Sequence, residues 1–210
     1  MECSVITTYR CNARCQMCEI WKHPTRIEEE FNPEILKKIP KGIKRLNITG
    51  GEPMLRNDIN KIVSILDTKT KHLEISTNGY FTERIVKIAE KFPNITVRAS
   101  IEGLPKINDK LRGIKDGFDH AMKTILHLKE LRIKNIGFAM VISDKNVADL
   151  LDVYHLCAAM NVEFSTSTLH NSFYFFKDDN KIVELEMTLT NMKKFLKALL
   201  ESPRANLHLR

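Results

Sequence analysis

The sequence predicts an α/β fold, a partial TIM-like (β/α)6 barrel, from three observations. Six short runs rich in β-branched residues alternate with segments of helical period along the 210 residues. The runs are far enough apart for a helix to cross between them, which favours parallel strands and right-handed connections. Polar or glycine-rich motifs follow four consecutive runs, and barrels of this kind carry their active sites where the strands end.

Each expected strand is a short apolar run between polar segments. The six runs are Ser4 to Tyr9, Lys44 to Thr49, His72 to Thr77, Ile95 to Ile101, Asn135 to Ser143 and Val162 to Thr168.

Amphipathic segments between these runs predict the helices that cover the sheet. Asn32 is the expected N-cap of a helix that begins at Pro33, and Asn57 is the expected N-cap of the next helix. Leucine, isoleucine, valine and alanine then recur at three- and four-residue spacing in four further segments. These segments are residues 82–92, 118–131, 146–160 and 191–203.

The composition is that of one globular unit with a moderate excess of positive charge. Hydrophobic residues make up 43% of the chain, which is enough for one sizeable core. The 33 basic residues outnumber the 26 acidic ones, but they are spread over amphipathic segments, so a nucleic-acid surface is not expected. No apolar run reaches the roughly 20 residues of a membrane span, and the opening "MECSVITTYR" lacks the apolar stretch of a signal peptide. We therefore expect a cytoplasmic protein.

Three of the five cysteines lie in "CNARCQMC", at Cys11, Cys15 and Cys18. In a reducing compartment, such a cluster more often binds metal or does redox chemistry than forms disulfides. A structural zinc site needs four ligands, and a redox pair would leave Cys11 without a purpose. A four-iron, four-sulfur cluster fits better, because three thiolates hold three irons and leave the fourth open. A zinc-stabilised binding module and an iron–sulfur electron carrier remain the alternatives.

The motifs carry a family resemblance. "CNARCQMC" resembles the cysteine signature of the radical S-adenosylmethionine (SAM) superfamily, and "TGGEP" at residues 49–53 looks like its GGE motif. "STNG" and "SIEG" occur where the third and fourth strands of that family meet the cofactor. The resemblance extends over residues 4–168 and is nearest to the SPASM/MoaA-like branch. No cysteine follows Cys157, so the auxiliary-cluster cysteines of that branch are missing.

The resemblance implies a radical SAM enzyme with two cofactors, a four-iron, four-sulfur cluster and SAM. Cys11, Cys15 and Cys18 would ligate the cluster, and SAM would chelate its fourth iron. Reductive cleavage of SAM would produce a 5′-deoxyadenosyl radical that abstracts hydrogen from a substrate. The electron would come from a reductant such as flavodoxin or ferredoxin. The substrate is a peptide, a lipid-like molecule or a small metabolite, and the sequence does not identify it.

The resemblance also implies which residues bind SAM. Glu52 would accept a hydrogen bond from the methionyl ammonium, Gly50 and Gly51 would permit close backbone approach, and Pro53 would stiffen the turn. The ribose hydroxyls or the methionyl group would meet Asn78, Ser100 and Glu102, with Asn146 as a further candidate. Met17 would cover the adenine ring. Arg56 and Arg112 either meet a carboxylate or lie on the solvated surface.

Two parts of the chain are expected. Residues 1–170 form the radical SAM core barrel, with the cluster-binding loop at 11–18. Residues 171–210 form a C-terminal extension with one helix. The chain is then either a minimal one-cluster barrel or a fragment that lacks a C-terminal domain.

Overall fold

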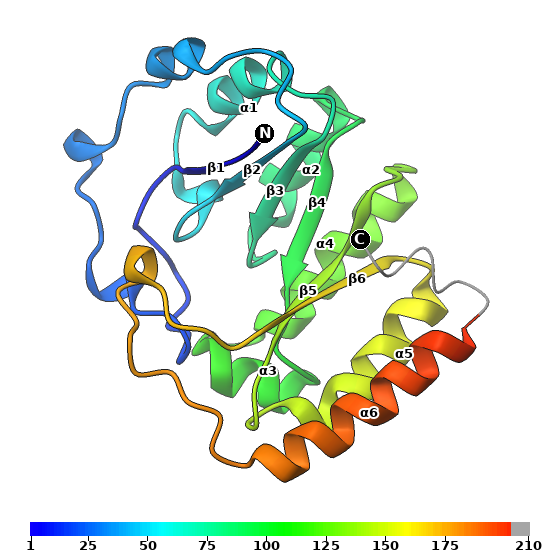
Figure 1. Cartoon of the computed structure of the whole chain (residues 1–210). Helices are drawn as coiled ribbons and strands as arrows, with labels where there is room; N and C mark the ends of the chain where they lie inside the picture. The colour runs from blue at the N-terminus through cyan, green and yellow to red at the C-terminus, as the bar shows by residue number, and fades with distance from the viewer. Residues whose placement is uncertain (203–210) are drawn as a thin grey trace.

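The fold is a single sheet of six parallel strands in the order β1 to β6, seen in the computed structural model of the chain (Figure 1). The model describes residues 1–202, so the ends of the expected helix over 191–203 and of the expected extension over 171–210 lie outside the described residues. The strands are β1 (Glu2–Ile6), β2 (Arg45–Thr49), β3 (Leu73–Thr77), β4 (Thr96–Ser100), β5 (Ile136–Ile142) and β6 (Glu163–Thr168).

All five neighbouring pairs are parallel, and strands that follow each other in sequence are neighbours in the sheet. Within residues 1–202, β1 and β6 are the two edges, so the barrel is open. The predicted partial barrel is confirmed.

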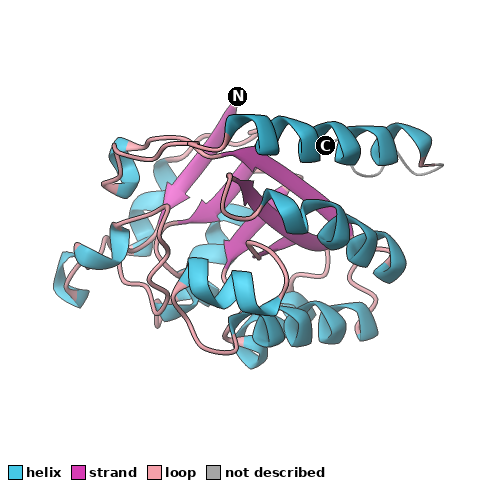
Figure 2. Cartoon of the chain, turned by 90° about the horizontal axis from the view of Figure 1, so that it is seen from below, coloured by secondary structure: helices cyan, strands magenta, loops and turns pink. Residues whose placement is uncertain are grey.

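Helices connect the strands and pack on one side of the sheet (Figure 2). The α-helices are α1 (Ile59–Asp67), α2 (Thr82–Lys91), α3 (Pro105–Arg112), α4 (Gly117–Glu130), α5 (Leu150–Met160) and α6 (Leu185–Glu201). Short 3₁₀ helices are η1 (Ile20–Lys22), η2 (Ile27–Glu29), η3 (Pro33–Lys38), η4 (Pro53–Leu55), η5 (Val147–Asp149) and η6 (Phe173–Phe175). None of the helices in the described part of the chain has the length and apolarity to span a bilayer.

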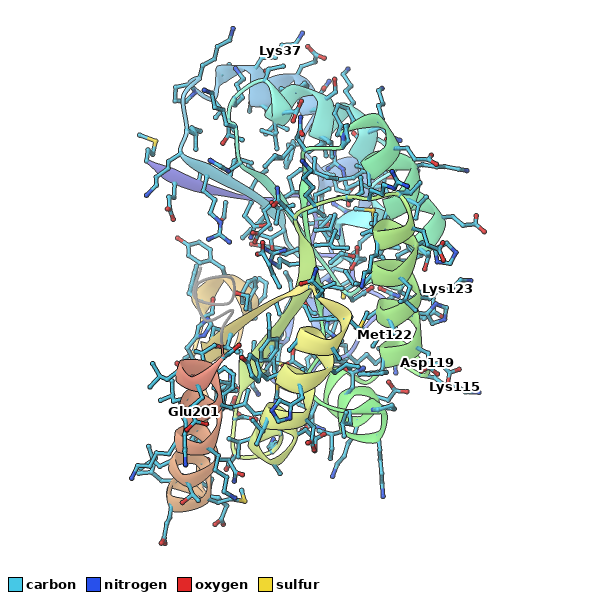
Figure 3. The ribbon with its side chains drawn as sticks, turned by 90° about the vertical axis from the view of Figure 1, so that its right-hand side faces the viewer. Lys37, Lys115, Asp119, Met122, Lys123 and Glu201 are labelled. Carbon is cyan, nitrogen blue, oxygen red and sulfur yellow. The ribbon has the colours of Figure 1, made fainter. Side chains whose placement is uncertain are left out.

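The core lies between the sheet and these helices. Leu46 and Ile48 of β2 are fully buried and join one apolar cluster with Ile62 of α1 and Ile85 of α2. The outer side of the helix layer carries charged side chains, such as Lys115, Asp119 and Lys123 (Figure 3).

Alternate strand residues face the inside of the barrel and are polar. Arg45 of β2 pairs with Glu74 of β3 at 2.7 Å, and Arg98 of β4 pairs with Glu163 of β6. The barrel lumen is therefore lined by polar pairs instead of the bulky apolar layers of a closed barrel.

The helix expected at Pro33 is present as the 3₁₀ helix Pro33–Lys38. Asn32 caps it, because its Oδ1 accepts a hydrogen bond from the N–H of Glu34 at 3.0 Å. The helix ends early because Pro40 restricts the preceding Ile39 to an extended conformation, with φ −63° and ψ 130°.

The expected N-cap at Asn57 is wrong. Helix α1 starts after Asp58, whose side chain makes no capping bond. The Asp58 carboxylate is instead held by the guanidinium of Arg56, with two nitrogen–oxygen distances of 2.8 Å.

Helix α3 was not predicted, because it is short and most of its residues are polar. Pro105 occupies its first turn and Gly113 ends it in the left-handed conformation, with φ 57°. The helix matters because its last turn reaches the cysteine loop.

The described part of the extension runs from β6 back across the cysteine loop and ends in α6, which packs on α5. Phe195 of α6 contacts Tyr154 of α5 and Phe164 of β6, with ring centroids 5.4 and 6.1 Å apart.

Candidate functional site

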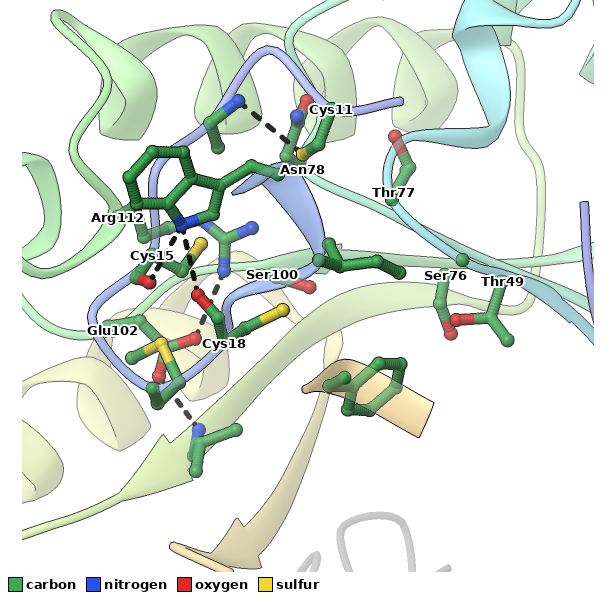
Figure 4. A pocket seen from close by; sticks show the side chains of 18 of the residues that line it. Cys11, Cys15, Cys18, Thr49, Ser76, Thr77, Asn78, Ser100, Glu102 and Arg112 are labelled. Carbon is green, nitrogen blue, oxygen red and sulfur yellow. Dashed lines mark hydrogen bonds and ion pairs between the residues drawn. The ribbon is translucent and has the colours of Figure 1, made fainter. Parts of the chain in front are cut away.

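A cavity opens at the carboxyl ends of the strands, between the cysteine loop and the ends of β2 to β6 (Figure 4). Nine of the predicted site residues line this cavity: Cys11, Cys15, Met17, Cys18, Gly50, Gly51, Asn78, Ser100 and Glu102. Several further residues, to which the sequence had not pointed as binding residues, also line the cavity: Ala13, Ile20, Thr49, Ser76, Thr77, Val141, Leu169, His170 and Phe175. The threonine and serine positions were visible as polar strand ends. Leu169 and His170 directly follow β6, Phe175 comes from the extension, and none of the three belongs to a motif.

Backbone hydrogen bonds from two sides hold the cysteine loop. On one side, the N–H of Gly51 donates to the carbonyl of Thr8, and the N–H of Glu52 donates to the carbonyl of Arg10, both at 2.8 Å. On the other side, the last turn of α3 accepts two hydrogen bonds of 2.8 Å. The N–H of Arg14 donates to the carbonyl of Arg112, and the N–H of Gln16 donates to the carbonyl of Leu111.

Gly51 and Gly113 are required by these close backbone contacts. A Cβ atom on Gly51 would lie 2.1 Å from the carbonyl oxygen of Arg10, and one on Gly113 would lie 2.6 Å from that of Arg14. Gly50 is similarly crowded by the Thr8 carbonyl and has φ 136°. The glycine pair of "TGGEP" therefore lets β2 approach the chain that leads into Cys11.

Trp21 supports the loop from η1. Its indole N–H donates to the carbonyl of Cys18 at 3.0 Å and lies 3.4 Å from that of Cys15 (Figure 4). Trp21, the only tryptophan of the chain, therefore packs beside the cysteine loop.

The three thiols are buried enough to resist ionisation by themselves. Burial raises the pKa of Cys11 to about 12 and that of Cys18 to about 11, and it also raises the pKa of Cys15. Thiolates at this position therefore need a cationic partner such as iron, whose binding would release the protons.

Arg112 and Glu102 form a buried ion pair behind the thiols. The Arg112 Nη1 lies 3.0 Å from Glu102 Oε1, and the other carboxylate oxygen accepts a hydrogen bond from the N–H of Val141 at 2.8 Å. Burial raises the pKa of Glu102 to about 7, against the opposing attraction of Arg112. The Arg112 Nε is buried without a hydrogen-bond partner. The alternative that Arg112 lies on the solvated surface is wrong, because only 9% of it is exposed.

Arg56 is also buried, but it does not line the cavity. Its guanidinium binds the carboxylate of Asp58 and donates to the carbonyls of Thr7 and Phe31. The carboxylates that Arg56 meets are therefore those of Asp58, at 2.8 Å, and Glu30, at 3.5 Å, both within the fold.

Glu52 lies behind the cavity wall and does not line it. Its Oε1 accepts from the N–H of Met54 at 3.0 Å and from the Thr77 hydroxyl at 2.8 Å, and its Oε2 accepts from the N–H of Asn78 at 2.7 Å. The carboxylate thus joins the ends of β2 and β3. Pro53 is buried at the start of η4 and does not line the cavity either.

Asn78 lines the cavity and also binds the cysteine loop, because its Nδ2 donates to Oδ1 of Asn12 at 2.6 Å. Asn146 lies outside the cavity. Its Oδ1 accepts from the N–H of Ser143 at 2.7 Å and its Nδ2 donates to the Val141 carbonyl at 2.8 Å, so it closes the turn after β5.

The donor set fits a multi-iron cluster better than one metal ion. Within residues 1–202, no group of three or more histidine, cysteine, aspartate or glutamate side chains is close enough to chelate a single ion. The three thiols instead surround one cavity, and the unpartnered Arg112 Nε in its wall can receive an anionic group. This arrangement suits a cluster with a carboxylate-bearing ligand beside it and does not support the zinc alternative.

A family model of the radical SAM superfamily matches residues 5–157. The chain belongs to the radical SAM superfamily. The cofactors of this superfamily are a four-iron, four-sulfur cluster and SAM, and its members are enzymes.

The chain is also similar to curated proteins and shares its fold with a solved structure. The sporulation killing factor maturation protein SkfB of Bacillus subtilis is 28% identical over 163 residues, which cover 75% of this chain and 40% of SkfB. GTP 3′,8-cyclase of Nautilia profundicola is 31% identical over 166 residues, which cover 70% of this chain and 50% of the cyclase. The crystal structure of Streptococcus suis SuiB bound to S-adenosylmethionine has a TM-score of 0.73 at 20% identity and covers 94% of this chain and 48% of SuiB. The chain thus spans about half the length of the relatives it matches.

The close approach of Gly51 to the Arg10 carbonyl predicts that a larger residue at position 51 causes a large and site-specific loss of stability. Gly51→Ala should lower the free energy of unfolding by about 3 kcal/mol, because backbone atoms that crowd a new Cβ cannot move aside cheaply. Gly42→Ala is the control. Gly42 has φ 81° but nothing within 4 Å of a Cβ, so only the conformational cost of about 1 kcal/mol remains. Thermal unfolding followed by circular dichroism measures the stability of both variants. Equal losses would contradict the claim that backbone atoms crowd a Cβ at position 51.

The buried ion pair predicts a non-additive pair of variants. Arg112→Gln should cost about 3 kcal/mol, because it leaves the Glu102 carboxylate buried without its cation. The double variant Glu102→Gln, Arg112→Gln should recover part of this loss, since no charge then remains buried. A double-mutant cycle in urea measures the coupling, and a double variant less stable than Arg112→Gln would argue against the pair.

Proposed function

We propose that this chain is a radical SAM enzyme in which Cys11, Cys15 and Cys18 ligate the four-iron, four-sulfur cluster. The single observation that carries the proposal is the convergence of these three thiols on one cavity at the carboxyl ends of the strands. The cluster held by these thiols would supply the electron for reductive cleavage of SAM, and the bound SAM would supply the radical chemistry that removes a hydrogen from the substrate.

The residues around the thiols would orient SAM. Arg112 offers its buried, unpartnered Nε to the methionyl carboxylate, and Glu102 keeps this guanidinium in place. Asn78 and Ser100 present polar side chains to the same space, for the ribose hydroxyls or the methionyl group. Met17 and Leu169 supply apolar cover for the adenine.

Glu52, Gly50 and Gly51 would contribute to SAM binding less directly than the family motif implies. The Glu52 carboxylate already accepts three hydrogen bonds, so its Oε2 has one remaining lone pair for the SAM ammonium. Its main contribution would be to hold the wall of the cavity in place.

We favour a peptide as the substrate class and the cytoplasm as the compartment. SuiB, which shares the fold, has been crystallised with its precursor peptide SuiA. The polar lumen of the barrel offers the hydrogen-bonding groups that a peptide backbone needs.

Loss of one thiol should abolish the reaction. In anaerobically reconstituted protein, Cys15→Ser should reduce bound iron and bring the release of 5′-deoxyadenosine from SAM to background, because the cluster loses a ligand. Cys3→Ala is the matched control, since Cys3 lies in β1 outside the cavity. This variant should keep both its bound iron and the release of 5′-deoxyadenosine.

The measurements are iron and sulfide content, the visible absorption of the cluster, and chromatography of the SAM products. A Cys15→Ser protein that cleaves SAM at the wild-type rate would overturn the proposal. Reversible reduction of the wild-type cluster without any 5′-deoxyadenosine would favour the electron-carrier alternative.

A further inference from the structure

We propose that a basic groove at the amino ends of β2 and β3 binds an acidic segment of the peptide substrate. The groove is lined by residues 42–44, which lead into β2, and by residues 68–72, which lead into β3. This inference rests on the proposed function, because it takes a peptide as the substrate. It goes further by assigning that peptide a run of aspartate or glutamate residues remote from the residue that reacts.

The fold brings together lysines that are far apart in the sequence. The two segments that line the groove lie side by side, because Ile43 and Thr70 form a parallel bridge and the N–H of Ile43 donates to the carbonyl of Lys69 at 3.1 Å. Lys44 from one segment and Lys71 from the other are exposed, and both line a space of about 470 Å³. Two backbone segments fixed to each other therefore present these side chains at one groove.

A third lysine supplies a buried positive charge. Only 8% of Lys69 is exposed, although it lines the groove. Its Nζ donates to the carbonyl of Lys37 at 2.8 Å, and within residues 1–202 no carboxylate pairs with it. An ammonium group has three N–H donors, so two of them remain. A buried cation without a counter-charge is unfavourable, and a carboxylate of a bound ligand would supply that counter-charge.

The nearby acidic residues do not cancel this charge. None of the described residues that line the groove is aspartate or glutamate. Glu74 is paired with Arg45 at 2.7 Å, which leaves Asp67 at the end of α1 and Glu2 in β1 as the carboxylates close to the groove. Four lysines in or next to the groove outnumber these two carboxylates: Lys41, Lys44, Lys69 and Lys71.

The groove fits carboxylates better than it fits nucleic acid. Among the described residues, no arginine, phenylalanine, tyrosine or tryptophan lines it. It thus lacks the forked donors that read base edges and the large rings on which bases stack. The Thr70 Oγ1 accepts a hydrogen bond from the N–H of His72 at 3.0 Å, so its own O–H can donate to a carboxylate beside the lysines.

The position of the groove determines where the acidic run lies in the peptide. The groove is at the amino ends of β2 and β3, and the cavity with the three thiols is at their carboxyl ends. Strand β2 has five residues. At about 3.3 Å per residue it spans about 17 Å, so at least about six extended residues must separate the acidic run from the reacting one. Binding at the groove would raise the local concentration of the reacting residue at the cavity.

The test removes the same charge at two places. Lys44→Gln with Lys71→Gln changes the groove. Lys87→Gln with Lys123→Gln is the control, because these lysines are exposed on α2 and α4 and the change in net charge is equal. None of the four lysines lines the cavity with the thiols.

The probe is fluorescein-labelled octaglutamate, and fluorescence anisotropy measures its binding to the reconstituted protein at low salt. The Lys44/Lys71 variant should bind it about fivefold more weakly than wild type, and the difference should shrink at high salt, where exposed charges are screened. The control pair should bind it like wild type, and octaglutamine with the same label should not bind. No binding by wild type, an equal loss in both pairs, or tighter binding of octauridylate than of octaglutamate would overturn the proposal.

Carbodiimide coupling of unlabelled octaglutamate to lysine, followed by mass spectrometry, locates the site directly. Amide bonds to Lys44 and Lys71 in wild type support the proposal, and coupling confined to lysines outside the groove contradicts it. Neither measurement needs SAM turnover. Failure of wild type to cleave SAM with dithionite would instead count against the proposed function, while the binding and coupling results would still decide whether the groove takes an acidic peptide.

Discussion

The site depends on one constraint, the contact of backbone with backbone around the cysteine loop. The loop has little regular structure of its own, so neighbouring elements must hold it. Gly51 lets the end of β2 pair with the chain before Cys11, and Gly113 lets the end of α3 approach Arg14. Because each contact involves main-chain atoms, no side chain can rotate away to make room for a larger residue. The loop is thus positioned by two glycines before any cofactor binds.

Buried charges impose a second constraint on the same space. Glu52 and Glu102 are both buried beneath the strand ends, and each joins two strands through its carboxylate. Of the two, Glu102 forms the direct ion pair with Arg112, which comes from the helix that also holds the loop. The packing of α3 therefore fixes the position of the thiols and the charge behind them together. This explains how a helix with little apolar surface can be central to the site.

The fold could be predicted from the sequence because its strands are short apolar runs of regular spacing. The polar motifs that follow β2, β3 and β4 then indicated that the site lies at the carboxyl ends of the strands. The place of the cysteine loop and most of the predicted residues of the cavity wall could be inferred from the order of these motifs along the strands. What could not be predicted were positions decided by tertiary contacts. Arg112 looks like a surface residue in a polar segment, and only the fold shows that it is buried. Asn146 looks like a site residue, but its side chain is used within its own turn.

The extension holds the cysteine loop through contacts that no sequence pattern predicts. The N–H of Glu19 donates to the carbonyl of Phe175, and Asn180 donates to the carbonyl of Met17. Residues beyond β6 thereby bind both ends of the segment between Met17 and Glu19, while Phe175, His170 and Leu169 line the cavity. Because the barrel is open between β1 and β6, this crossing segment takes the place of the missing strands.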